Sequence, residues 1–162
     1  DSTPVRAVLA FVAAWGLPGT AESMGTLPGD VADAVVAGAK AEGLLGPLLE
    51  CVDNGALTLP ASAMEAAVHA HEAALWWCLA VEQRLGQVDR WFEEAGGVRY
   101  RVLKGPAMAH LDDVDPSLRS FGDLDLLVAA SDMDAALQVL ADHGGRRVFP
   151  PRRAGFDRRF AL

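Results

Sequence analysis

Two carboxylates lie two residues apart within an apolar run, and they are the strongest chemical signal in this sequence. They are Asp123 and Asp125, in residues 122–128 (GDLDLLV). Because alternate residues of a strand point to the same face, a strand here would place both carboxylates side by side, with Leu124 and Leu126 in the core. Like charges held this close repel, and a shared cation relieves that repulsion; hard oxygen ligands favour Mg²⁺ or Mn²⁺. The alternative is an exposed edge strand whose carboxylates bind nothing.

A cationic turn precedes this pair in the chain. Residues 98–103 (VRYRVL) predict a strand, and Lys104-Gly105-Pro106 then leads into a short helix over 107–111. A glycine before a helix offers backbone N–H groups to a phosphate, and Lys104 adds a positive charge. If the two strands are neighbours, the turn and the carboxylates share one end of a sheet. This arrangement suits phosphoryl or nucleotidyl transfer, whereas the alternative is an ordinary surface lysine.

The ordered set of Leu103-Lys104-Gly105, Arg119 and residues 122–128 resembles the core of uncharacterised bacterial nucleotidyltransferase-like proteins of the DNA polymerase beta-like superfamily. The resemblance covers residues 98–150. It implies a nucleoside triphosphate substrate, Mg²⁺ or Mn²⁺, and an unknown small-molecule, peptide or protein acceptor. By resemblance, Asp123 and Asp125 are the catalytic metal ligands. Lys104, Gly105 and Arg119 would contact the nucleotide or its phosphates, although Arg119 is equally suited to pairing with one of the two carboxylates.

The sequence departs from the superfamily pattern in two places. The superfamily usually has Gly-Ser at the turn, and Lys104-Gly105-Pro106 lacks the serine. A third carboxylate is expected on a later strand, but no convincing candidate follows Phe149, since Asp157 has a strongly basic setting. We therefore expect the core to be truncated at the C-terminus, before the third acid. A catalytically inactive nucleotidyltransferase fold, acting as a binding or regulatory module, is the alternative function.

Composition excludes several classes of function. With 51% apolar residues the chain can form a real core, and its net charge of −8 argues against general binding to nucleic acid or to an anionic membrane. Residues 1–97 hold 4 Lys/Arg and 13 Asp/Glu, whereas residues 98–162 hold 10 and 9. The basic end includes six arginines within 146–159, an alternative site for a phosphate-rich ligand or nucleic acid. No segment approaches the roughly 20 apolar residues that span a bilayer.

The two cysteines form no metal-binding pattern. Cys51 and Cys78 belong to no CxxC pair, so they predict buried free thiols and a reducing cytoplasm rather than a zinc site.

Hydrophobic spacing and breakers predict an α+β fold: an N-terminal helical region over 1–97, then a minimal nucleotidyltransferase-fold mixed sheet with flanking helices over 98–162. The expected helices are 5–15, 30–36, 44–51, 60–94, 107–111 and 132–143, and the expected strands are 98–103, 123–128 and 146–149.

The aromatic residues of the long helix predict packing rather than ligand binding. Trp76, Trp77 and Trp91 are expected in the core. His69 and His71 are two residues apart, so a helix would place them on different faces and they are not expected to share a metal.

Overall fold

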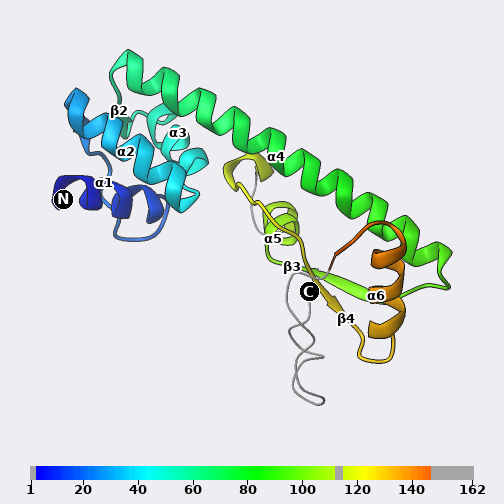
Figure 1. Cartoon of the computed structure of the whole chain (residues 1–162). Helices are drawn as coiled ribbons and strands as arrows, with labels where there is room; N and C mark the ends of the chain where they lie inside the picture. The colour runs from blue at the N-terminus through cyan, green and yellow to red at the C-terminus, as the bar shows by residue number, and fades with distance from the viewer. Residues whose placement is uncertain (1–2, 112–114, 147–162) are drawn as a thin grey trace.

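A computed structural model of the chain describes residues 3–111 and 115–146, with an α+β architecture (Figure 1). The N-terminal elements are α1 (Thr3–Ala13), β1 (Gly25–Thr26), α2 (Gly29–Glu42), α3 (Leu45–Asp53), β2 (Leu57–Thr58) and α4 (Ala61–Glu94). The C-terminal elements are β3 (Tyr100–Leu103), α5 (Gly105–Leu111), the 3₁₀ helix η1 (Pro116–Leu118), β4 (Asp125–Val128) and α6 (Met133–Asp142).

The expected helices are all present, and local chemistry explains their ends. Gly43 ends α2 in the left-handed conformation (φ 70°) and donates its N–H to carbonyls of the last turn. Pro60 directly precedes α4, and Gly96 and Gly97 follow it with φ values of 100° and 83°. The predicted bounds of α4 are confirmed, whereas α2 continues six residues past its predicted end at 36, until Gly43 stops it.

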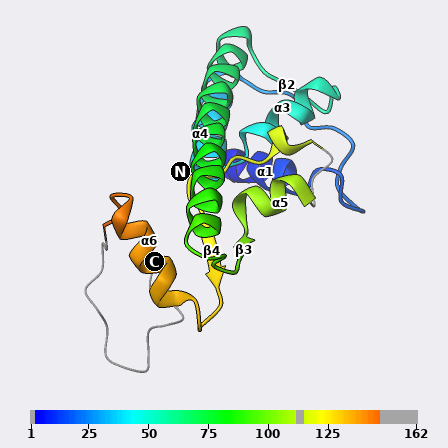
Figure 2. The same ribbon diagram turned by 90° about the vertical axis from the view of Figure 1, so that its right-hand side faces the viewer.

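Helix α4 runs the length of the molecule and joins two hydrophobic cores (Figure 1). Its first part packs against α2 and α3 in a core that α1 completes, where Val35, Leu48 and Cys51 are fully buried. Its last part packs against β3, β4 and α6 through Val88 and Phe92. Figure 2 shows α3 and α5 on the same side of α4. Neither α4 nor any other helix within 3–111 and 115–146 is long and apolar enough to cross a membrane.

The prediction that Trp76 and Trp77 lie in the core is wrong. Their exposed fractions are 73% and 60%, because this stretch of α4 lies between the two cores and only the face of Cys78 is covered. Trp91 lies near the end of α4 and packs against the second core, the one that contains Val88 and Phe92. It is half-buried and stacks on His143, with 4.1 Å between the ring centroids. For Trp91 the prediction is confirmed.

The two strands of the site pair with each other, but they are shorter than predicted. β3 and β4 are antiparallel, with Leu103 opposite Asp125 and Tyr100 opposite Val128. Asp123 lies just before β4 rather than within it. The described residues form two separate two-stranded sheets instead of one mixed sheet, since β1 and β2 pair in parallel beside α3. Of the predicted third strand, 146–149, only Arg146 lies within the described residues.

The segment after α5 packs tightly against α3. A Cβ built on Gly46 would overlap the backbone carbonyl of Leu118 in η1, and backbone cannot yield as a flexible side chain does. We expect Gly46→Ala to lower the free energy of unfolding by about 2 kcal/mol or more in denaturant titration. Gly86→Ala in α4 is the matched control, because its Cβ meets nothing within 4 Å. It should stabilise the chain by about 0.5–1 kcal/mol, and equal effects of the two would contradict the tight packing.

Candidate functional site

The antiparallel register brings the cationic turn onto the carboxylates. Because Leu103 pairs with Asp125, the next residue, Lys104, lies beside that carboxylate, and its Nζ is 3.0 Å from Asp125 Oδ2. The hydrogen bond and the charge of Asp125 raise the pKa of Lys104, and the charge of Asp123 raises it further. Lys104 therefore pairs directly with Asp125.

This ion pair is open to solvent. The side chains of Lys104 and Asp125 are 77% and 41% exposed. An exposed pair of this kind contributes little to stability, since water screens both charges. Lys104 can consequently leave Asp125 for a more highly charged partner at small cost.

The backbone conformation of the turn favours glycine. Gly105 has φ 28°, and a Cβ there would lie 3.4 Å from the Asp123 carbonyl oxygen and from Phe121 Cβ. The backbone of the turn thus approaches the segment that leads into Asp123. The helix that follows offers few free donors, because Pro106 has no N–H and Met108 donates its own to the Lys104 carbonyl.

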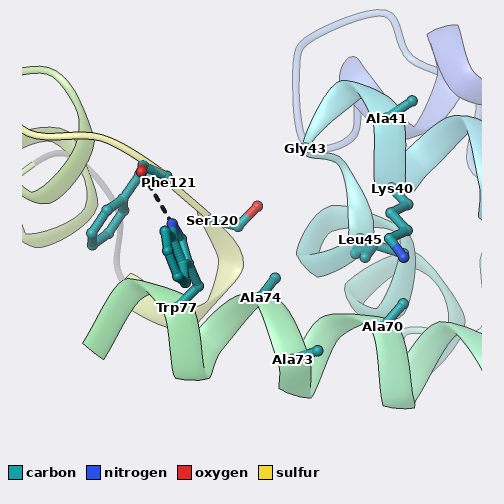
Figure 3. Close-up of a pocket in the computed structure, with 11 residues that line it drawn as sticks. Lys40, Ala41, Gly43, Leu45, Ala70, Ala73, Ala74, Trp77, Ser120 and Phe121 are labelled. Carbon is teal, nitrogen blue, oxygen red and sulfur yellow. Dashed lines mark hydrogen bonds between the residues drawn. The ribbon is translucent and has the colours of Figure 1, made fainter. Parts of the chain in front are cut away.

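Helix α4 holds the chain just before Asp123. Cys78 Sγ lies 3.4 Å from the Phe121 carbonyl oxygen and accepts from the Phe121 N–H at 3.2 Å. Next to it, the Trp77 indole N–H donates to the Gly122 carbonyl at 3.0 Å (Figure 3). Cys51 and Cys78 are both buried and free, as predicted. The contacts of Trp77 and Cys78 with the backbone at 121–122 leave no signal in the sequence, because neither residue type nor helical spacing shows which side chain will hydrogen-bond to a distant segment.

We expect Cys78→Ala to speed amide hydrogen exchange at Phe121, because the substitution removes the acceptor of that N–H. Cys78→Ser, which retains an acceptor, should preserve more of the protection. The matched control is Cys51→Ala, a second buried thiol that makes no hydrogen bond to this segment. It should destabilise the chain through a cavity without selectively exposing Phe121. Equal rates of exchange at Phe121 in the two alanine variants would show that Cys78 does not hold this segment in place.

Arg119 lies apart from the carboxylate pair. It follows η1 and lines a hollow of about 430 Å³ together with residues of α1, α2 and α3, including Glu42 at the end of α2 and Glu50 of α3. Within the described part of the chain, no ion pair joins Arg119 to Asp123 or Asp125; Asp125 pairs with Lys104 instead. The structure thus brings together Lys104, Gly105, Asp123 and Asp125, and a contact between Arg119 and phosphate stays a prediction.

The carboxylate pair has the donor chemistry for one kind of metal site. Among residues 3–111 and 115–146, no group of three or more His, Cys, Asp or Glu side chains could hold a metal ion. Mg²⁺, however, commonly binds through one or two carboxylates, with water and substrate phosphate as its other ligands. Asp123 and Asp125 fit that requirement, and Asp157 lies outside the described residues.

Comparison with known proteins decides the family. Residues 29–159 match the model of a family described as uncharacterised nucleotidyltransferases. The chain belongs to this nucleotidyltransferase family. Family membership indicates a nucleotide substrate, and the match spans α2, α3 and α4 as well as the site. No curated protein and no solved structure matches the chain.

Proposed function

We propose that this protein transfers a nucleotidyl group from a nucleoside triphosphate to an acceptor hydroxyl, in the cytoplasm. The observation that carries the proposal is the contact between Lys104 and Asp125 in a member of a nucleotidyltransferase family. Asp123 and Asp125 would hold Mg²⁺ or Mn²⁺. The bound ion would neutralise the triphosphate and the departing pyrophosphate.

In this reaction the acceptor oxygen forms a bond to the α-phosphorus. The bond from that phosphorus to its bridging oxygen breaks, pyrophosphate leaves with the electron pair, and the hydroxyl proton passes to water. This chain's own residues bind and orient the reactants. Lys104 exchanges its exposed contact with Asp125 for the phosphates, and Gly105 lets the backbone approach them closely. Arg119 would have to reach the phosphates from the neighbouring hollow.

Metal removal tests the proposal. With excess EDTA, release of pyrophosphate from labelled nucleoside triphosphate should fall to background in the presence of candidate acceptors. Excess Mg²⁺ or Mn²⁺ should restore it. Turnover that persists in EDTA would rule out the assignment of Asp123 and Asp125.

A catalytically inactive binding module is the second candidate, and one observation favours it. The described residues supply two acids rather than three. Such a module would bind nucleotide with Mg²⁺ in calorimetry and release no pyrophosphate with any acceptor. The two measurements together separate the candidates, because binding alone is common to both.

A further inference from the structure

We propose that a cavity beside Asp123 binds the acceptor, a small molecule with a planar aromatic ring and an anionic group. The cavity has a volume of about 430 Å³ and lies between the end of α2, the middle of α4 and residues 120–122 (Figure 3). That the occupant is the acceptor rests on the proposed nucleotidyl transfer. The existence of the binding site does not.

One side of the cavity is suited to a flat ring. The indole of Trp77 forms a wall, and Ala70, Ala73 and Ala74 line the cavity along α4 (Figure 3). The hydrogen bond from Trp77 to the Gly122 carbonyl fixes one edge of the indole at 3.0 Å. An aromatic ring held in this way offers a stacking face at little cost in side-chain entropy.

The other side carries a positive charge. Lys40, in the last turn of α2, lines the cavity across from Trp77 (Figure 3). Lys40 makes no ion pair with any residue in the described ranges. A cation and an aromatic wall at the two ends select a ligand with a ring at one end and a carboxylate or phosphate at the other. A nucleoside triphosphate also combines a ring with phosphates, but the proposed function places its phosphates at the Lys104-Gly105 turn, outside this cavity. Its base alone would leave Lys40 without an anion, so the acceptor is the better occupant.

The cavity is continuous with the carboxylate site along the chain. Ser120, Phe121 and Gly122 form its third side, and the next residue is Asp123. The same segment contacts the Lys104-Gly105 turn, through Phe121 and the Asp123 carbonyl. An acceptor in this cavity would therefore lie against the segment that enters Asp123, while the triphosphate lies against the turn on the other part of that segment.

Binding of 2-naphthoate, measured by calorimetry without nucleotide, tests the site. The wild-type chain should bind 2-naphthoate about tenfold more tightly than the neutral 2-naphthalenemethanol, and Lys40→Gln should abolish that preference. Trp77→Ala should weaken both probes about tenfold. Trp76→Ala is the matched control, because Trp76 is a similarly exposed neighbour that does not line the cavity. Equal loss in the two tryptophan variants would overturn the site.

A second pair of variants tests the site independently, in case Trp77→Ala does not fold. Ala73 lines the cavity and is exposed, so Ala73→Glu should fold normally and exclude 2-naphthoate through its negative charge. Ala66→Glu, equally exposed on α4 but outside the cavity, should bind the probe as the wild type does. If Ala73→Glu binds 2-naphthoate normally, the site is wrong.

The acceptor assignment is tested separately with a probe that carries a hydroxyl. With nucleotide and Mg²⁺, 6-hydroxy-2-naphthoate should stimulate pyrophosphate release by the wild type and by Ala66→Glu, and Ala73→Glu should not respond to it. Asp123→Asn should lose all release while still binding 2-naphthoate. Metal-dependent turnover without probe binding would overturn the cavity alone. Probe binding without any turnover would overturn the proposed function and, with it, the acceptor assignment.

Discussion

Asp125→Asn should lower kcat/KM for nucleotide turnover at least about a hundredfold while leaving the fold intact. Loss of a group that only supports a metal ligand already costs about 10–100-fold, so loss of a ligand should cost no less. Asparagine has nearly the same shape, and the pairing of Asp125 with Leu103 uses backbone atoms. Because the ion pair with Lys104 is exposed, its loss should barely change the melting temperature.

Asp123→Asn should have a comparable effect, and the two substitutions should not be additive. If both acids hold one ion, losing either already abolishes the site, so the double variant should be little worse than each single variant. Asp134→Asn is the matched control, because this exposed carboxylate lies in the first turn of α6. Steady-state kinetics at saturating Mg²⁺ should leave the control at the wild-type rate. Independent, multiplicative losses at 123 and 125 would contradict a shared ion.

The helices and the pairing of the site's strands could be predicted because their signals are local. Period, glycine and proline give α3 and α4 to within two residues, whereas α2 runs to Glu42, six residues past its predicted end at 36; alternation identifies β3 and β4. The prediction that strand β4 begins at Asp123 failed by two residues, since the chain before Asp125 contacts α4 and the Lys104-Gly105 turn instead of a strand. Only long-range contacts determine where such a strand begins.

The partners of the carboxylates and of the long helix could not be predicted, because they depend on which surfaces meet. Periodicity shows that Trp76 and Trp77 lie on a helix, but it cannot show that the helix crosses a gap between two cores. Likewise, Lys104 and Arg119 are both cations near the acids in sequence. Only the register of β3 and β4 makes Lys104 the partner of Asp125.

The helices and the site belong to one physical unit. Gly46 of α3 packs on Leu118, and Trp77 and Cys78 of α4 bind the chain at 121–122. A change in either helix would therefore move the segment that enters Asp123. The family match likewise includes α3 and α4, although the chemical motif begins only near residue 103.

Lys104→Met should change the affinities for nucleotide and for metal in opposite directions. The triphosphate loses a cationic partner, so its KM should rise about tenfold or more. The ammonium group no longer competes for Asp125, so the protein without nucleotide should bind Mg²⁺ a few-fold more tightly in calorimetry. The gain is limited because the pair is exposed. Methionine has a similar length and meets the same backbone strain as lysine at φ 51°, so the fold should persist. Arg101→Met, at an exposed position in β3, is the control and should change neither value. If Lys104→Met leaves both values unchanged as well, Lys104 is an ordinary surface lysine and the phosphate site lies elsewhere.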